Sequence, residues 1–246
     1  MRIIIAALSL FVATAAAAAQ TYAVMSVVGD GLLVVQHRPT TGSSLEGNVR
    51  EFLPISNPAL DRAVLLAVDD AVRRADPSAR TVLVGGRDAG ALEAQSRTLG
   101  KDDALQIVVD TLRPHLPSTG ATRLILVAKS RHAARISLGD GSTGSGSLEG
   151  LGYYLDPTIP TARGDTGEAG YGLLAPFAYF TVALVDLQSG KILAERPVYA
   201  SYGLSQARSD TLSAWEVLTP EQKVRNIESL IRAEIARAVP ALLDAR

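Results

Sequence analysis

The chain has 246 residues, with 24 lysines and arginines against 25 aspartates and glutamates, a formal net charge of −1, and no cysteine. Without cysteine, disulfides, thiol catalysis, Cys-ligated zinc and a lipid on an amino-terminal cysteine are excluded. No concentrated basic run stands out, which argues against nucleic acid as a partner.

The first residues have the pattern of a secretory signal peptide. A positive start precedes the apolar run Ile3–Val12, and a small-residue stretch follows it. Ala17 and Ala19 match an A-x-A site, so we expect cleavage after Ala19. The apolar run is shorter than the about 20 residues that span a bilayer. We therefore predict a signal peptide at 1–19 and, at 20–246, a single soluble periplasmic domain that has no transmembrane segment and is not a lipoprotein.

Strand and helix patterns alternate through the first half of the chain. Tyr22–Val28 and Leu32–Gln36 are β-rich runs joined by Gly29-Asp30-Gly31, which predicts an amino-terminal β-hairpin. A helix follows, with Asn57 as a suitable N-cap and Pro58 at its first position. Its predicted buried stripe has a spacing of four residues: Leu60, Val64, Val68 and Val72.

A strand–helix–strand pattern comes next. Thr81–Val84 and Arg123–Ala128 read as buried strands, and the helical pattern between them is divided at Gly100. This spacing predicts a parallel pair joined by a crossover. Beyond it, Arg131–Leu138 remains compatible with extended structure.

Gly139–Gly172 is rich in glycine, serine and threonine. We expect this glycine-rich excursion to be the most mobile segment and the favoured place for function, because long connections in compact domains usually serve a function or are disordered. The apolar island Tyr153-Tyr154-Leu155 predicts one internal anchor, such as a strand of a second hairpin.

The carboxy-terminal part has the clearest patterns. Phe177–Leu187 is apolar on both faces and predicts a central strand, and Ile192–Tyr202 predicts its antiparallel return. Thr219 and Gln222 form a capping box for a last helix. The apolar stripe of that helix is Val224, Ile227, Ile231, Ile235 and Val239. The order of elements predicts one α/β domain, bordering on α+β, with a mixed sheet packed by about three to four helices.

Two glycine motifs invite a phosphate-binding interpretation. Gly139–Gly144 reads G-x-G-x-x-G, but no amphipathic helix follows, so we interpret it as a flexible turn. Gly85-Gly86-Arg87-Asp88 lies between a strand and a helix, where backbone N–H groups bind anions. Capping of that helix by Asp88 is the simpler interpretation.

The polar residues indicate no known catalytic or metal site. His37, His115 and His132 are far apart and lack zinc-ligand spacing. His132 with Asp140 and a serine makes a triad on paper, although serines in glycine-rich segments are mostly turn formers. We therefore predict no catalytic, cofactor-binding or metal-binding residue and no cofactor. Half of the aromatic residues bracket the glycine-rich segment and read either as core anchors or as a partner face: Tyr153, Tyr154, Tyr171, Phe177, Tyr179 and Phe180.

Phe177–Glu195, FAYFTVALVDLQSGKILAE, resembles a strand–turn–strand of exported accessory proteins. These are the curli-secretion lipoprotein, the penicillin-binding-protein activator lipoproteins and the amino-terminal domain of the Tol translocation protein. Asp186, Ser189, Gly190 and Lys191 match the shared pattern, whereas the lipoprotein cysteine is missing. The runs SLEGLGYYLDPT and AWEVLTPEQKVRNIESLIRAEI are similar to exported bacterial proteins of unassigned function.

These observations predict a periplasmic, non-enzymatic binding or accessory module whose partner is another envelope protein or an envelope ligand. The alternative is a periplasmic hydrolase whose site is built from residues 131–176.

Overall fold

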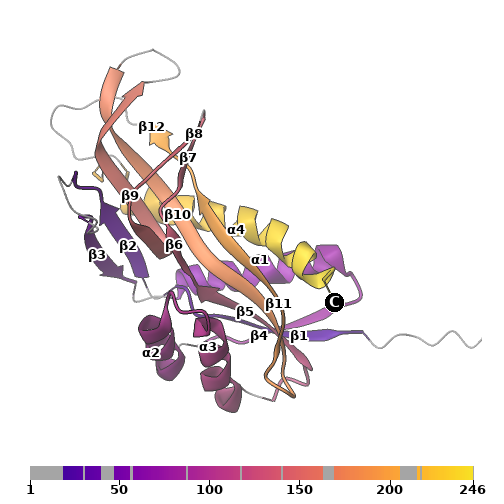
Figure 1. Ribbon diagram of the computed structural model, residues 1–246. Coiled ribbons are helices and arrows are strands. Elements are labelled where there is room, and N and C mark those ends of the chain that lie inside the picture. The colour runs from indigo at the N-terminus through magenta and orange to yellow at the C-terminus, as the bar shows by residue number, and fades with distance from the viewer. Residues whose placement is uncertain are drawn as a thin grey trace, which may run out of the picture.

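Figure 1 shows a computed structural model of the protein. It describes residues 19–29, 31–39, 47–55, 58–86, 88–116, 118–139, 141–162, 169–205, 215–216 and 218–245, with the backbone alone at 160–162, 169–171 and 205. The body of the expected signal peptide lies outside these ranges, as do Asp30, Asn57 and Asp140.

The described chain contains four α-helices, one short 3₁₀ helix and twelve strands. The helices are α1 (Ala59–Ala75), α2 (Ala89–Thr98), α3 (Ala104–Leu112), the 3₁₀ helix η1 (Arg113–His115) and α4 (Pro220–Leu243). The strands are β1 (Thr21–Ser26), β2 (Gly31–Gln36), β3 (Val49–Pro54), β4 (Arg80–Leu83), β5 (Arg123–Lys129), β6 (Arg131–Ala133), β7 (Ile136–Leu138), β8 (Gly141–Thr143), β9 (Ser147–Ala162), β10 (Ala169–Asp186), β11 (Ile192–Ser201) and β12 (Leu204–Ser205).

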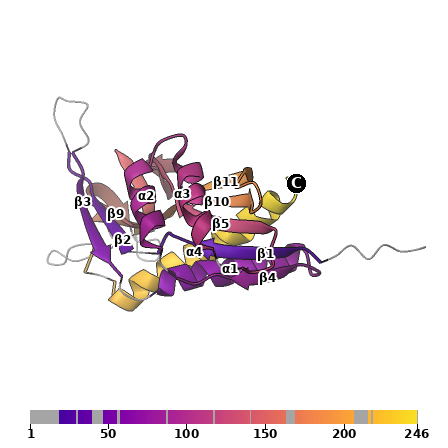
Figure 2. The same cartoon turned by 90° about the horizontal axis from the view of Figure 1, so that it is seen from below.

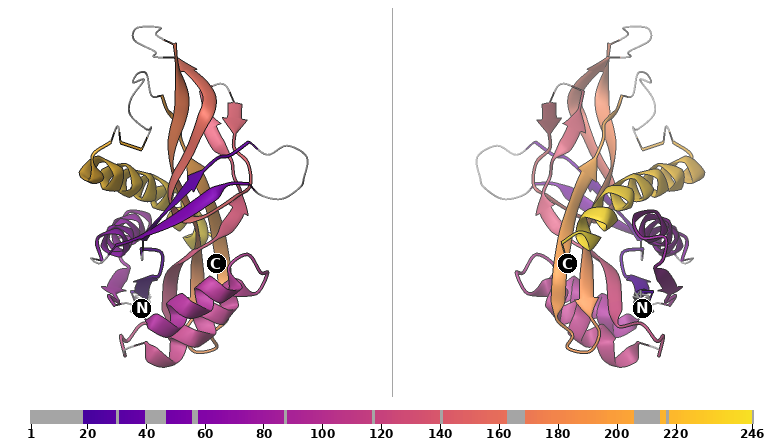
Figure 3. Two further views of the ribbon diagram at one scale, coloured as in Figure 1. Left: turned by 90° about the vertical axis from the view of Figure 1, so that its left-hand side faces the viewer. Right: turned by 90° about the vertical axis from the view of Figure 1, so that its right-hand side faces the viewer.

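The predicted fold class is confirmed: the molecule is one α/β domain with a mixed sheet between two layers of helices. The sheet runs β3-β2-β9-β10-β5-β1-β4, with β11 and β12 on β10 and β6 on β9. Helices α1 and α4 cover one face, and α2 and α3 cover the other (Figure 2). Figure 3 shows α1 and α4 side by side along the sheet, where they pack against one another.

The sheet divides into two halves along the length of β10. The carboxyl-terminal part of β10, Phe180–Asp186, pairs with β5, and the part before it, Leu173–Tyr179, pairs with β9 on the same edge. On the side of β5 and β9 away from β10, β1 pairs in parallel with β5 and β2 pairs in parallel with β9. We call the line along which β1 gives way to β2, and β5 to β9, the seam.

The predicted amino-terminal hairpin is wrong, because β1 and β2 belong to different halves of the sheet. Both edges of β1 are occupied, by β4 and by β5, so β2 cannot fold back onto it. The glycines that suggested a turn serve close approaches instead. A Cβ on Gly29 would lie 2.6 Å from the backbone nitrogen of Asp61, and one on Gly31 would collide with the Phe52 ring.

The parallel pairing predicted for the next two strands needs a similar correction. Strands β4 and β5 occur where expected, but each pairs in parallel with β1, which lies between them. β1, the first strand of the chain, therefore lies between β4 and β5, which the sequence pattern predicted to pair directly with each other.

The glycine-rich segment is not an irregular connection along its described length, because it forms β8, β9 and the beginning of β10. The anchor at Tyr153-Tyr154-Leu155 is confirmed as part of β9, which forms a hairpin with β10. Gly152 has a packing role, since a Cβ there would overlap the carbonyl oxygen of Leu33 on β2. Of the G-x-G-x-x-G motif, Gly139 lies in the turn between β7 and β8 and Gly141–Thr143 forms β8, so the predicted turn covers only the start of the motif.

The helix predictions hold with small shifts. The stripe of α1 is fully buried, although its N-cap is Pro58 rather than Asn57, which lies outside the described residues. Gly100, with φ +88°, separates α2 from α3. Thr219 and Gln222 form the capping box of α4, whose apolar stripe is buried from Ile227 to Val239.

The aromatic residues around the glycine-rich segment are core anchors. Five of them have no exposed surface: Tyr153, Tyr154, Phe177, Tyr179 and Phe180. The side chain of Tyr171 lies outside the described part of the chain. Trp215 packs edge-on against Tyr153 and lies under the ammonium of Lys223, 3.8 Å from the ring centre, so it anchors the segment before α4. Among the residues that the structure describes, no helix has the length and apolarity needed to span a membrane.

Candidate functional site

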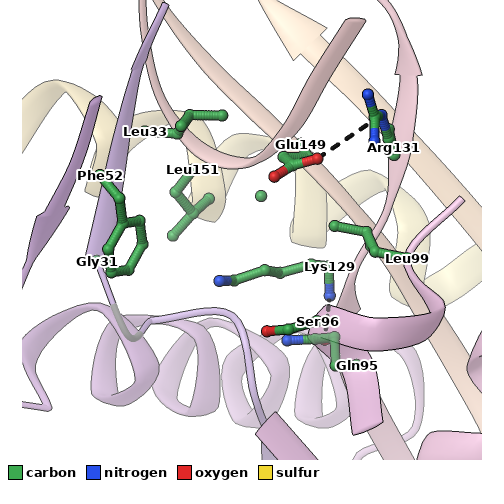
Figure 4. A pocket seen from close by; sticks show the side chains of 11 residues that line it. Gly31, Leu33, Phe52, Gln95, Ser96, Leu99, Lys129, Arg131, Glu149 and Leu151 are labelled. Carbon is green, nitrogen blue, oxygen red and sulfur yellow. Dashed lines mark hydrogen bonds and ion pairs between the residues drawn. The ribbon is translucent and has the colours of Figure 1, made fainter. Parts of the chain in front are cut away.

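A cavity of about 360 Å³ opens at the seam, on the side of the sheet that carries α2. Figure 4 shows its walls, which come from both halves of the sheet and from α2. The side chains that define its chemistry are Phe52, Ser96, Lys129, Arg131, Glu149 and Leu151. We refer to it as the seam cavity.

Gln95 on α2 bridges the ends of β1 and β5 at the base of the cavity. Its side chain, only 2% exposed, donates a hydrogen bond of 2.8 Å to the carbonyl oxygen of Val27 and accepts one of 2.8 Å from the backbone N–H of Lys129. These two groups lie at the ends of β1 and β5, where the sheet divides, and buried backbone groups require partners. Gln95 supplies both, so the cavity has a rigid base.

Lys129, the last residue of β5, extends across the cavity (Figure 4). Its stem lies on Gly150, where φ is +63° and a Cβ would come within 3.1 Å of the lysine Cδ. Its ammonium stands 5.5 Å from the centre of the Phe52 ring, within cation–π range. Phe52 is 49% exposed on the edge strand β3. A cation is therefore held over an aromatic face at the mouth of the cavity.

A small ion cluster forms the opposite rim. Glu149 lies 3.7 Å from Arg131 Nε and 3.8 Å from Arg50 Nη1. Both arginines also donate to the Ser147 hydroxyl, at 3.1 Å and 2.9 Å respectively. One carboxylate thus lies between two guanidinium groups at this rim of the cavity.

A second cavity of about 280 Å³ adjoins the first and shares Leu99, Lys129 and Arg131 with it. It continues over the α2–α3 turn toward Pro197 and Tyr199 on β11. The second cavity is lined mainly by polar and charged side chains of both signs, Lys101, Asp102 and Glu195 among them.

The triad that could be made on paper is described only at His132, which stacks on Tyr199 with ring centres 4.3 Å apart, since Asp140 lies outside the described residues. Within the described ranges, no three histidine, aspartate or glutamate side chains converge as metal ligands. Asp88 caps α2 by accepting from Ala91 N–H at 2.7 Å, as the simpler interpretation of that motif predicts.

A serine–histidine contact that sequence reasoning missed joins β2 to the start of β9. Ser145 Oγ lies 2.7 Å from His37 Nδ1, and Asn48 Oδ1 lies 3.2 Å from the same nitrogen. Asn48 Nδ2 donates to the Ser145 carbonyl, which turns its Oδ1 toward the ring. Ser145 and Asn48 thus both approach the same ring nitrogen, whereas in a catalytic triad the serine and the orienting group contact opposite nitrogens of the histidine. Tyr154 OH accepts from Ser145 N–H at 3.2 Å, and the group pins the chain before β9.

The residues of the seam cavity were not identified from the sequence. Lys129 ends a buried parallel strand, and the carboxyl ends of such strands are where ligands commonly bind in α/β sheets. The place of Lys129 at the end of a buried strand was the sequence feature that could have indicated a ligand site there. The approach of Phe52, Gln95 and Glu149 depends on the division of the sheet, which no local pattern indicates.

Comparisons with known proteins add little. No family model matches the chain, and no curated protein matches it either. The chain is similar to a solved structure described as the hypothetical protein CT253 from Chlamydia trachomatis, with 12% identity, a TM-score of 0.30, and coverage of 91% of this chain and 99% of that one. A likeness at this level carries no functional argument.

Proposed function

We propose that this protein is an exported, non-enzymatic binding or accessory module of the bacterial envelope, and that it engages its ligand or partner at the seam cavity. The amino-terminal pattern up to Ala19 and the resemblance of Phe177–Glu195 to exported accessory proteins support the compartment.

The observation that carries the proposal is the seam cavity itself. It brings side chains from three strands of one half-sheet, β2, β3 and β9, to the end of β5 in the other half, over a base closed by Gln95. Ser145 and Asn48 both contact Nδ1 of His37, which is not the arrangement of a catalytic triad, so the hydrolase alternative gains no support from the described residues.

Site-specific photocrosslinking in intact cells tests the use of the cavity. A photoreactive phenylalanine analogue replaces Phe52, which is 49% exposed, or Leu66 on α1, which is 45% exposed. We expect a discrete adduct from position 52 and none of the same mass from position 66. Identical adducts from both positions, or no adduct from position 52, would contradict the proposal.

Amino-terminal sequencing of the protein recovered from the periplasm tests export. We expect the chain to begin near Gln20. A periplasmic form that begins at Met1, or a protein confined to the cytoplasm, would contradict the proposed compartment.

A further inference from the structure

We infer that the outer edge of β4 pairs with the same edge of a second copy of this chain. The two β4 strands run antiparallel across a two-fold axis at Val82, so that two sheets become one. No residue of β4 lines the seam cavity, and the inference therefore goes beyond the proposed function.

The outer edge of β4 presents backbone groups without a strand partner among the described residues. β4 ends the sheet and pairs with β1 alone. Arg80 and Val84 donate their N–H groups to β1, at 2.9 and 2.8 Å. Because successive residues of a strand direct their backbone groups to opposite edges, the N–H and C=O groups of Thr81 and Leu83 point outward. β11 also pairs with a single described strand, but Pro197 in its middle has no N–H to offer.

A two-fold axis at Val82 makes this edge complementary to itself. Thr81 of each copy then stands opposite Leu83 of the other, and each of these two pairs exchanges two N–H···O=C hydrogen bonds. The side chain of Leu83 is 40% exposed and would pack on the Thr81 methyl group of the second copy. On the other face of the sheet, Val82 would meet its own copy, so both faces of the contact are apolar at the axis.

The charges beside the axis favour a second copy over an unrelated strand. Val82 pairs with Ala23, which packs under α2 and α3, and Arg80 shares that face of the sheet with Val82. In the proposed register, Arg80 of each copy lies opposite Val84 of the other. Val84 borders a cavity of about 210 Å³ to which Asp88 contributes a carboxylate. The exposed Arg80 has no ion pair within the described chain, and the two-fold axis places it beside an acid of the opposite copy.

The residues that follow β4 leave room for the incoming strand. A Cβ on Gly85 or on Gly86 would meet no atom within 4 Å. In the proposed register, residues 77–79 of the second copy pass beside these two glycines. Helix α1 covers one face of β4, where Asp69 accepts a hydrogen bond from the Thr81 hydroxyl, and it leaves the outward backbone groups of the strand accessible.

Because the chain has no cysteine, a single introduced cysteine tests the register directly. Val82→Cys places two thiols opposite each other in a non-hydrogen-bonded pair, where the Cα separation of about 4.5 Å lies within the range that a disulfide spans. We expect the full chain with this substitution to form a disulfide-linked dimer in air at least ~10-fold faster than Leu193→Cys does. Leu193 is the matched control, since it is 46% exposed and lies on β11.

Sedimentation equilibrium of the purified full chain tests the association itself. We expect the unmodified chain to form a dimer. Leu83→Pro removes one outward N–H from each copy and keeps those that face β1, so it should raise the dissociation constant at least ~10-fold. Arg80→Glu brings a like charge beside Asp88 and should also weaken the dimer, whereas Arg74→Glu on the exposed surface of α1 should not. Circular dichroism shows that each variant is folded, and Arg80→Glu with Val82→Cys decides the matter if Leu83→Pro is not.

Several results would overturn the inference. One is a monomer at all concentrations up to about 100 µM, and another is a dimer that Arg80→Glu leaves unchanged. Equal crosslinking of Val82→Cys and Leu193→Cys would place the contact elsewhere. In intact cells, a disulfide from Val82→Cys to a different protein would show that the edge receives another partner. None of these results bears on the seam cavity, which the crosslink at Phe52 tests separately.

Discussion

The side-chain oxygen of Gln95 accepts a hydrogen bond of 2.8 Å from the backbone N–H of Lys129. The same amide donates to Val27 on the neighbouring strand end, so one side chain on α2 joins the last residue of β5 to the residue that follows β1. This contact holds the base of the seam cavity, because it gives hydrogen-bond partners to backbone groups at the strand ends where the sheet divides.

Replacement of Gln95 by leucine should therefore be costly. Gln95→Leu keeps the approximate size of the side chain but removes the donor to the buried Val27 carbonyl and the acceptor of the Lys129 N–H, and each lost hydrogen bond of this kind costs about 1–3 kcal/mol. We expect urea unfolding to show a loss of at least about 2 kcal/mol. The neighbouring exposed Ser96→Ala should change stability by less than about 0.5 kcal/mol. Equal midpoints for the two variants would show that Gln95 does not hold the seam.

Glycine at position 152 is required by the pairing of β2 with β9. A Cβ there would overlap the carbonyl oxygen of Leu33, so Gly152→Ala should force the strands apart and cost about 3 kcal/mol or more. Gly139→Ala is the matched control, because its Cβ would meet no atom within 4 Å. Circular dichroism during urea unfolding measures both, and a Gly152→Ala protein as stable as the control would refute the register of β2 on β9.

Helix α4 belongs to the core, and Ile231 tests this. Its side chain has no exposed surface and packs between the sheet and α1. Ile231→Ala should cost about 2–5 kcal/mol, while Arg232→Ala, on the exposed face of the helix, should cost less than about 0.5 kcal/mol. An unchanged denaturation midpoint for Ile231→Ala would place α4 outside the core.

The cap of α2 should make stability depend on acid pH. The Ala91 N–H that Asp88 accepts, followed by its contact with His115, holds the pKa of the Asp88 carboxyl below its ordinary value. The stabilisation is therefore complete above the ordinary value of about 3.9 and is lost as pH falls through the lowered folded value. Asp88→Ala should cost about 1 kcal/mol at pH 7.

Urea unfolding at several pH values measures this dependence. We expect the difference between Asp88→Ala and the unmodified protein to shrink as pH falls below the folded pKa of Asp88, with the exposed Asp70→Ala as control. A difference that stays constant from neutral to acid pH would show that the cap does not depend on the charge of Asp88.

Amide hydrogen exchange tests the reassignment of the glycine-rich segment. Residues Gly152–Leu155 of β9 pair with β2 on one side and β10 on the other, so their amides should exchange as slowly as those of Val182–Leu184. Among the strands that the structure describes, β8 (Gly141–Thr143) pairs with β7 alone, so its amides should exchange faster. Fast exchange across Gly152–Leu155 would instead support the mobile excursion expected from composition.

Local patterns in the sequence predicted the elements whose signals are complete within a few residues. The capping box at Thr219 and Gln222, the four-residue stripe of α1 and the apolar run of β10 each reflect a local rule that the fold obeys. The composition of Gly139–Gly172 suggested an irregular connection where the structure has strands. Glycine indicates conformational freedom in the unfolded chain, but it does not indicate that a neighbouring strand occupies the volume where a side chain would lie. Gly152 is such a case, since the carbonyl of Leu33 occupies the volume of its missing side chain.

Only the tertiary structure decided which strands pair and where the cavity lies. β1 is enclosed by β4 and β5, which arrive about 60 and 100 residues later in the chain, so the Gly29–Gly31 turn signal could not form its hairpin. The same long-range pairing divides the sheet and brings Phe52, Lys129 and Glu149 together from three distant strands. These three residues come close because of strand pairing and packing over the whole sheet, and the sequence around any one of them does not reveal that pairing.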